Sequence, residues 1–207
     1  LNGFEEKRIH CIPTFTASKT TIGKQQIGSY GLYFGRVTEE KGVETVIKAY
    51  EKLPEYTVKI MGDDTTDEAK RLKKYVENHK MKNVEFLGFK SGAELENVIK
   101  GARFTLIPSI WYDNLPNTAL ESFQYSKPVI ASNIGSLPEL VIDGENGYLF
   151  KPSNVEDLIK KIKMLDDDTL VKKMGQASRK RLESRFAPQT HYEDLMKIFN
   201  EAVKSRK

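Results

Sequence analysis

The sequence predicts an α/β fold, namely a Rossmann-like, doubly wound parallel sheet of about six strands. Short apolar segments alternate with single amphipathic segments from residue 30 onward, and strands separated by single helices pair in parallel through right-handed crossovers. The strand segments are almost continuously apolar, as expected of a sheet that helices cover on both faces. The length of 207 residues suits one domain of this kind.

The predicted strands are short apolar or aromatic runs bounded by turn-forming residues. The first, YGLYFG, is rich in aromatic residues and stops at Gly35, and the second, YTVKIMG, stops at Gly62. The turn residues DGENG precede the last strand, GYLF. The predicted strands are 30–35, 56–62, 83–89, 103–109, 127–132 and 147–150.

The predicted helices carry apolar residues at intervals of three or four, so that one face of each is apolar. VETVIKAYEKL stops before Pro54, DEAKRLKKYVENHK is charged and exposed, and the last helix begins after Pro188. The remaining part of the chain after Val155 is also helical in pattern. Before the last one, the predicted helices are 43–53, 67–80, 93–101, 116–126, 136–143, 155–165 and 169–186.

This pattern divides the chain into three parts. Residues 1–28 form a lead-in, in which IHCIP at 9–13 reads as a short strand stopped by Pro13 and is followed by a polar linker. Residues 29–187 form the Rossmann-like domain, and residues 188–207 form a terminal helix. Because the sequence starts at Leu1 in what reads as the end of a helix, we expect it to be a piece of a longer protein.

Composition excludes several classes of function. The net charge of +4 is modest, and no basic stripe with interleaved aromatic residues is present, so we expect no nucleic-acid partner. The single cysteine, Cys11, excludes an internal disulfide and suits a reducing compartment, so we expect a cytoplasmic protein. Three scattered histidines lack ligand spacing, and we expect neither a metal nor another cofactor.

The sequence contains no apolar run near the roughly 18 residues that suggest a membrane span. Lysines and arginines gather in residues 159–185, where they are interpreted as solvated faces of helices. A weak peripheral attraction of these residues to the anionic inner face of a membrane is the alternative.

Two cations follow the first predicted strand. Arg36 and Lys41 lie on one loop at the carboxyl end of that strand, where an open parallel sheet binds its ligands. Arginine offers a planar fork and lysine a point charge, so the pair can hold a diphosphate. The alternative is two solvated loop cations. Neither a GxGxxG nor a GxxxxGK[ST] motif is present, so a dinucleotide site or a P-loop is unsupported.

The stretch PSIWYDNLPNTALES at 108–122 is the strongest candidate for a site. It joins a buried strand to a helix whose start is favoured by Asn114 or Asn117 as a cap and by Pro116 in the first turn. The amides of residues 117–119 would then be free to bind a phosphate. The sequence therefore predicts a phosphorylated ligand at this helix start.

Two carboxylates flank this helix start. Asp113 precedes it, and Glu121 lies one turn deeper, within reach of hydroxyls near the phosphate. Taken alone, Asp113 reads as a cap or turn former, and Glu121 as a first-turn acid favoured by the helix dipole. Gly135 and Ser136, after the fifth predicted strand, can present further amides to the same cleft. The segment FLGFKSGAEL, which ends the third strand, can meet a nucleobase through its backbone or be an ordinary loop.

These motifs resemble the C-terminal domain of retaining GT-B-fold glycosyltransferases of family 4. The resemblance runs from about Tyr30 to Phe186 and is carried by GLYFGRVTEEKGVETVIKAY, VEFLGF, VEDLIKKI and the block from PSIWYDN to NGYLF, all in the order of the family. It implies a domain that binds a nucleotide-diphosphate sugar, UDP- or GDP-linked. The complete enzyme would transfer the sugar to a glycan or lipid-linked acceptor, as in polysaccharide synthesis.

The resemblance assigns roles residue by residue. Arg36 and Lys41 match the basic pair at the donor diphosphate, and Asn117 and Thr118 match the helix start under the phosphate. In the Glu-x7-Glu pattern of the family, Asp113 matches the first acid, which faces the donor sugar. Glu121 matches the second acid, which accepts hydrogen bonds from the ribose, and Gly88 falls in the segment that borders the base.

Two departures from the family pattern affect the expected function. The first acid is aspartate, whose arm is shorter by one methylene, and this substitution bears on sugar preference. The N-terminal domain that supplies the acceptor site does not match any part of this sequence, so we expect this chain alone to be inactive and its last helix to pack toward that domain. The rival interpretations are half of a sugar-nucleotide epimerase and a non-catalytic nucleotide-binding or interaction module.

Overall fold

The computed structural model describes residues 3, 5, 9–16 and 26–204. A six-stranded sheet in the order β3-β2-β1-β4-β5-β6 forms its centre, and every pairing within this sheet is parallel. The α/β Rossmann-like fold expected from the sequence is thereby confirmed. The strands are β1 (Tyr30–Phe34), β2 (Thr57–Met61), β3 (Val84–Gly88), β4 (Ala102–Ile107), β5 (Val129–Ser132) and β6 (Gly147–Phe150).

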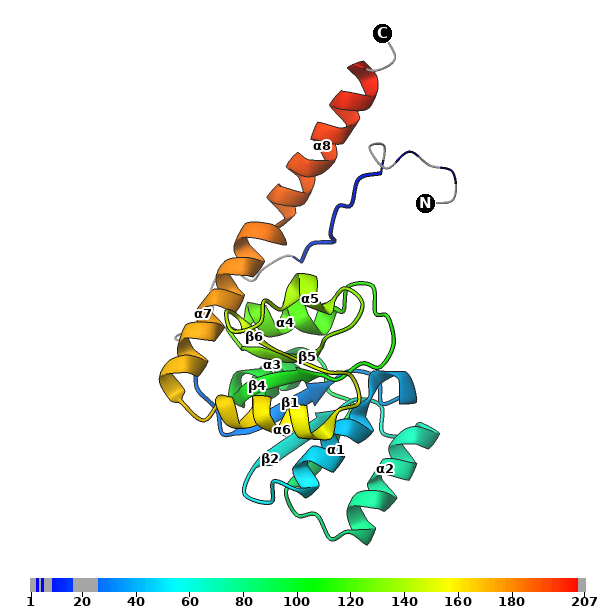
Figure 1. Cartoon of the computed structure of the whole chain (residues 1–207), viewed down its shortest axis with the longest axis vertical. Coiled ribbons are helices and arrows are strands. Elements are labelled where there is room, and N and C mark those ends of the chain that lie inside the picture. Colours follow the sequence, from blue (N-terminus) through cyan, green and yellow to red (C-terminus); the bar gives the residue numbers. More distant parts are fainter. Residues whose placement is uncertain (1–2, 4, 6–8, 17–25, 205–207) are drawn as a thin grey trace.

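Helices connect successive strands, and three further helices follow the last strand, β6 (Figure 1). The last two, α7 and α8, form a long stem that extends beyond the sheet, with the described part of the N-terminal segment beside it. The helices are η2 (Glu39–Lys41), α1 (Val43–Glu51), α2 (Asp67–Asn78), α3 (Gly92–Gly101), α4 (Asn117–Gln124), α5 (Leu137–Leu140), α6 (Val155–Met164), α7 (Asp168–Arg185) and α8 (Pro188–Lys204).

Helices cover both faces of the sheet. One face packs against α1, α2 and α6, and Figure 1 shows α1 and α6 side by side over the strands. The opposite face packs against α3, α4 and α5 in two smaller clusters. Successive residues of a strand point to opposite faces, so Tyr33 of β1 joins the first cluster while Leu32 and Phe34 join the other side. Most strand residues are apolar because helices bury both faces of the sheet, whereas the edge strand β3 leaves Glu85 exposed.

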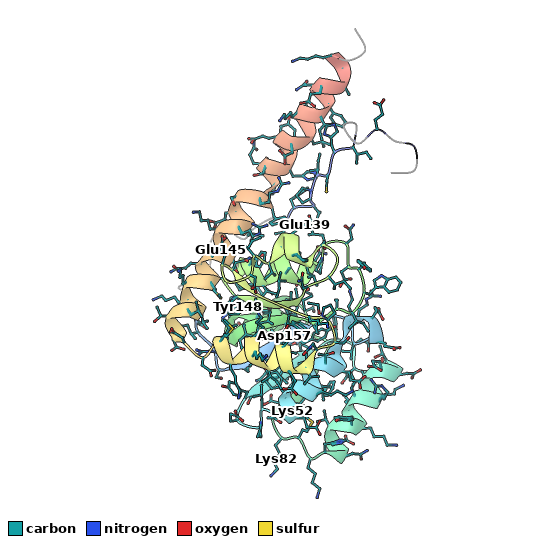
Figure 2. The ribbon with its side chains drawn as sticks, viewed as in Figure 1. Lys52, Lys82, Glu139, Glu145, Tyr148 and Asp157 are labelled. Carbon is teal, nitrogen blue, oxygen red and sulfur yellow. The ribbon has the colours of Figure 1, made fainter. Side chains whose placement is uncertain are left out.

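The long helices after the sheet have different surroundings. Helix α7 runs past the edge at β6, where Val171 and Met174 reach one core cluster and Leu182 reaches another. Helix α8 buries none of its residues, and Figure 2 shows side chains along both edges of its ribbon. None of the helices in the described part of the chain is long and apolar enough to cross a bilayer.

A buried lysine ties together three segments at the amino ends of the strands. Lys127 is 1% exposed, and its Nζ donates hydrogen bonds of 2.7 Å to the carbonyl oxygens of Gln26, Lys100 and Ala102. All three of its donors are therefore used, which offsets the cost of burying the charge. Burial lowers the pKa of Lys127 to about 8. This residue anchors the approach to β1 against the junction of α3 and β4.

Several predictions of local structure need correction. Residues 9–13 lie in no strand, because no strand of the described chain lies beside them to supply a ladder of hydrogen bonds. They run instead beside α8, where the carbonyl of Pro13 lies 2.9 Å from Nδ1 of His191 and the Phe15 ring packs on the imidazole. The helix expected at 136–143 is a single turn, α5, because the chain turns extended at Val141.

Candidate functional site

Two adjoining cavities lie at the carboxyl ends of the central strands. Strand β1 pairs with β2 on one side and with β4 on the other, so the order in which the chain adds strands to the sheet reverses there. This switch point is where open α/β sheets bind ligands. The larger cavity has a volume of about 510 Å3 and the smaller about 190 Å3. Both are lined by Phe34, Gly35, Arg36 and Thr118, so one elongated ligand can occupy both.

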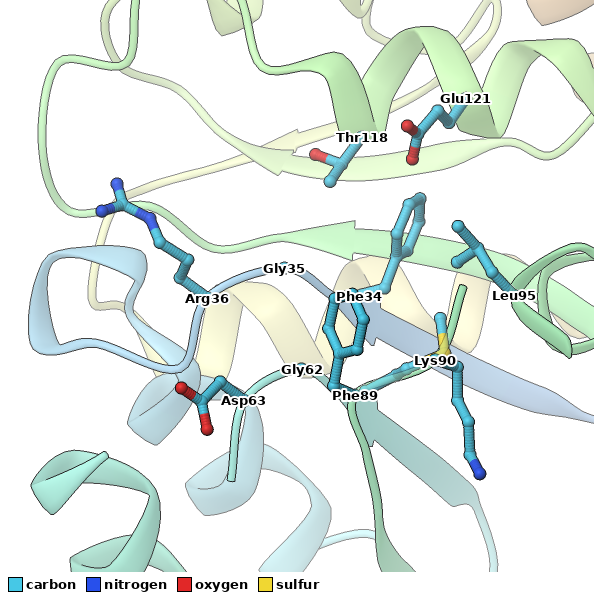
Figure 3. A pocket seen from close by; sticks show the side chains of 11 residues that line it. Phe34, Gly35, Arg36, Gly62, Asp63, Phe89, Lys90, Leu95, Thr118 and Glu121 are labelled. Atoms are coloured by element: carbon cyan, nitrogen blue, oxygen red, sulfur yellow. The ribbon is translucent and has the colours of Figure 1, made fainter. Parts of the chain in front are cut away.

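The larger cavity is mainly apolar with a few polar groups at its border. Phe34, Met61 and Leu95 line its inner part, and the 73% exposed ring of Phe89 lies at its border. Figure 3 shows Thr118 and Glu121 projecting from α4 into this space, across from the segment that holds Phe89 and Lys90. An apolar chamber with few polar groups suits a flat ring with polar substituents, such as a nucleobase.

Glu121 is the carboxylate of the larger cavity. It lies in α4, one turn after the helix start, and burial raises the pKa of its side chain. In the described part of the chain, no hydrogen bond or ion pair engages this carboxylate. A carboxylate that is partly desolvated and has both oxygens available is suited to accept hydrogen bonds from hydroxyls of a ligand.

The start of α4 borders the smaller cavity and lacks a side-chain cap. Pro116 occupies the capping position, and no side chain of the described residues accepts a hydrogen bond from the first-turn amides. The predicted asparagine cap is therefore wrong, as is the placement of Pro116 within the helix. Of the three amides predicted to be free for a phosphate, that of Ala119 is not, because it donates a hydrogen bond to the carbonyl of Pro116 at 3.0 Å. The first two helical amides, of Asn117 and Thr118, have no acceptor within the helix and border the cavity.

The two predicted cations occupy different environments. The side chain of Arg36 is 74% exposed and lines both cavities, and its guanidinium lies 3.9 Å from the Glu40 carboxylate. Lys41 is only 19% exposed, and its Nζ lies 2.5 Å from Oδ1 of Asp113. The structure therefore brings both cations to the smaller cavity but pairs Lys41 with an acid 72 residues further along the chain.

Asp113 accepts three hydrogen bonds that the sequence did not predict. Its Oδ1 accepts from Lys41 and its Oδ2 accepts from the buried hydroxyl of Ser109 at 2.6 Å. Its backbone carbonyl accepts from the hydroxyl of Ser136 at 3.0 Å. This contact of the Ser136 hydroxyl was not predicted from the sequence, and the expectation that the amides of Gly135 and Ser136 face the cleft stays a prediction. Ser109 was missed, although its place directly after a buried strand is a usable signal.

Glycines let the loops around Asp113 approach each other. Gly42 has a φ of +67°, and a Cβ on it would lie 2.0 Å from the carbonyl oxygen of Pro108. Gly135 has a φ of +60°, and a Cβ on it would lie 3.2 Å from the Cα of Tyr112. Side chains at these two positions would separate the loop of Lys41 from the loop of Asp113.

A hydrogen bond from the side chain of Tyr33 fixes the backbone of the loop that carries Arg36. The hydroxyl of Tyr33 donates to the carbonyl of Arg36, and burial raises the pKa of this phenol far above its ordinary range. Gly88 ends β3, and its carbonyl accepts from the amide of Gly62 at 3.1 Å. The two residues that follow it, Phe89 and Lys90, line the larger cavity. No group of three or more His, Cys, Asp or Glu side chains suited to a metal occurs among the described residues.

Taken together, the site joins an apolar chamber that holds the Glu121 carboxylate to a smaller cavity lined by two cations, two helix-start amides and the Asp113 carboxylate. Such an arrangement fits a ligand that has a ring, hydroxyl groups and phosphate in that order.

Comparison with known proteins gives a consistent result. Residues 18–181 match the family described as glycosyl transferases group 1. An uncharacterized glycosyltransferase of Methanocaldococcus jannaschii is 30% identical over 174 residues, which cover 84% of this chain and 48% of that protein. The chain spans about half the length of the curated relatives it matches.

Solved structures share the fold. HepE of Anabaena, solved in complex with UDP, superposes with a TM-score of 0.76 at 23% identity, over 84% of this chain and 49% of that one. A C-terminal domain of a glycosyl transferase group 1 family protein from Francisella tularensis superposes with a TM-score of 0.68 at 26% identity. That match covers 80% of this chain and 90% of the Francisella domain.

Proposed function

Because this chain belongs to the group 1 glycosyltransferases, we propose that it is the donor-binding C-terminal half of an enzyme that transfers a sugar from a nucleotide-diphosphate sugar. The observation that carries the proposal is the pair of adjoining cavities at the carboxyl ends of β1 and β4. The family match does not favour the epimerase or the non-catalytic module. The UDP in the HepE structure supports a uridine or similar nucleotide as the donor carrier.

Each part of the donor has a counterpart in the site. The larger cavity takes the nucleobase, with Phe89, the residue after Gly88, at its border, and Glu121 accepts hydrogen bonds from the ribose. The diphosphate lies at the first amides of α4, between Arg36 and Lys41. Positive charge there stabilises the nucleotide diphosphate as it leaves, which is an electrostatic contribution to catalysis.

Asp113 lies at the sugar end of the donor. It lines the smaller cavity, and Lys41 and Ser109 fix its carboxylate. We assign the full-length enzyme to the retaining, hexosyl-transferring type of family 4, with UDP- or GDP-sugar as donor and a glycan or lipid-linked acceptor. The single cysteine of the chain supports a cytoplasmic location.

The other half of the enzyme would cover α8 and the segment before the sheet. Tyr192, Phe199 and Val203 of α8 are more than half exposed, and residues 9–16 run alongside this helix. An apolar helix face of this kind is expected to be buried by a further domain. With half of the cleft outside this chain, we expect the 207 residues by themselves to bind donor but not to transfer sugar.

The test is calorimetric titration of this chain with UDP, GDP and ADP in parallel. Half a cleft should bind one of them weakly, with Kd on the order of 0.1–1 mM. The variants Arg36→Ala, Lys41→Ala and Glu121→Ala should each weaken that binding. Lys82→Ala, an exposed lysine at the opposite end of the sheet, serves as the matched control. Failure of all three nucleotides to bind, both here and in a chain that includes the N-terminal half, would refute the proposal.

A further inference from the structure

Two large aromatic side chains stand in solvent next to the site. Trp111 is 65% exposed and Tyr112 is 74% exposed, and both lie in the loop 108–116 between β4 and α4. Large rings are costly to leave in water, and tryptophan and tyrosine are typical of surfaces that a ligand covers. The described residues nearby leave both rings largely uncovered.

The backbone that carries these rings is held at several points. The amide of Ile110 donates to the carbonyl of Glu40 at 3.0 Å, and the amide of Asp113 donates to the carbonyl of Trp111 at 2.9 Å. On the other side, Gly135 lies against the Cα of Tyr112. The loop thus presents its two rings outward from a braced backbone, which reduces the entropy lost when a ligand covers them.

The position of the loop identifies what the rings would cover. The base and ribose belong to the side of the larger cavity, near Glu121, and the diphosphate belongs to the smaller cavity. The sugar attached to the diphosphate must therefore leave the smaller cavity at its far border. Ser109 and Asp113 of the loop line the smaller cavity but not the larger one, and Trp111 and Tyr112 lie between them in sequence.

We propose that Trp111 and Tyr112 form a stacking platform for the sugar ring of the bound donor. A pyranose ring has an apolar face of C–H groups and a rim of hydroxyls, which matches an aromatic face with a polar Nε1–H or O–H at its edge. The platform orients the sugar over the Asp113 carboxylate. The inference rests on the proposed function and names two residues that determine sugar binding at that site.

The chain carries its own reporter for this contact. Trp111 is the only tryptophan in the 207 residues, so its fluorescence reports the environment of this loop alone. The experiment follows its emission while the protein is titrated with UDP, UDP-glucose and UDP-N-acetylglucosamine, and with GDP and GDP-mannose. Calorimetry measures the same affinities in variants that lack the indole.

The expected result separates the sugar from the nucleotide. A nucleotide sugar should change the emission of Trp111 more than the matching nucleotide does. Trp111→Ala and Tyr112→Ala should each weaken binding of the nucleotide sugar about 3- to 10-fold and leave the affinity for the nucleotide unchanged. Trp111→Phe should restore most of the loss because it keeps a stacking ring. Tyr192→Ala removes a ring of similar exposure on α8 and should change neither affinity.

Other results would overturn the inference. One such result is that the nucleotide binds while the ratio of the two Kd values, for nucleotide sugar and for nucleotide, is the same in Trp111→Ala and Tyr112→Ala as in the parent. In that case the platform does not exist. An emission change on adding maltoheptaose without nucleotide would assign the rings to an acceptor glycan and overturn the donor assignment. Absence of binding by every nucleotide, both to this chain and to a chain that includes the N-terminal half, would overturn the proposed function and this inference with it.

Discussion

Replacing Asp113 by asparagine should strengthen nucleotide binding, although the residue lies in the site. In the structure Nζ of Lys41 forms an ion pair with Oδ1 of Asp113 at 2.5 Å, and both side chains are less than one-fifth exposed. A diphosphate that enters the smaller cavity must share this lysine with the carboxylate or take it over. Asparagine has the same shape and can still accept the hydrogen bond from Ser109, but it does not hold a cation.

The magnitude follows from the contacts that change. A hydrogen bond between charged groups contributes about 1.5–3 kcal/mol, and part of this is lost when phosphate draws Lys41 away. Two like charges about 8 Å apart in an effective dielectric of about 20 repel by about 2 kcal/mol, and the substitution removes one of them. Since solvent and a second cation, Arg36, screen both effects, we expect a net gain of about 1–2 kcal/mol, or roughly 5- to 30-fold in Kd.

The assay is calorimetric titration with UDP and with inorganic pyrophosphate. Asp63→Asn is the matched control, because Asp63 is an exposed carboxylate that lines the larger cavity without an ion pair to Lys41. It should change Kd by less than about 2-fold. The part of the gain that comes from releasing Lys41 should be absent when Asp113→Asn is made in the Lys41→Ala background, where only the loss of repulsion between Asp113 and phosphate remains.

A weaker affinity in Asp113→Asn would refute this reasoning. It would mean that Asp113 holds Lys41 in the position the phosphate needs, rather than competing for it. The same variant should lower the turnover of a chain that includes the N-terminal half, since the carboxylate is assigned to the sugar.

Further predictions concern stability. Burial raises the pKa of Glu121, so the unfolded chain loses this proton at lower pH than the folded chain and ionisation destabilises the fold. Glu121→Gln should therefore raise Tm at pH 7. Scanning calorimetry should show that this gain in Tm vanishes as the pH falls below the ordinary glutamate pKa. A gain that persists in acid would contradict this. Lys127→Met leaves three carbonyls without their donor and should lower the free energy of unfolding by about 3 kcal/mol or more in denaturant titrations, whereas the exposed Lys82→Met should not. Gly42→Ala should destabilise the protein by more than about 2 kcal/mol and weaken UDP binding. Gly144→Ala, with a φ of +80° and no neighbour within 4 Å, isolates the cost of backbone strain, and equal losses in the two variants would refute the steric argument.

The sheet could be predicted because its signals are local. Each strand is a short apolar run and each helix before α7 has an apolar face, and all six predicted strands are confirmed within a residue or two. The apolar run at 9–13 shows the limit of such signals, since a strand needs a neighbour and none is described beside it. The asparagine cap at α4 failed for a related reason. Capping residues near a helix start predict a boundary, but only the backbone conformation decides which side chain reaches the amides.

By itself, the sequence determined the α/β alternation, the candidate loops at the carboxyl ends of the strands, and which cations and acids those loops carry. The roles of Arg36, Lys41, Asp113, Glu121 and the residues around them remain predictions. Only the tertiary structure decided that Lys41 pairs with Asp113, that Ser109 and Ser136 hold the same aspartate, and that Lys127 joins three segments. The reason is physical: these contacts join residues that parallel crossovers bring together, and sequence periodicity specifies which face a residue occupies but not its partner across the sheet.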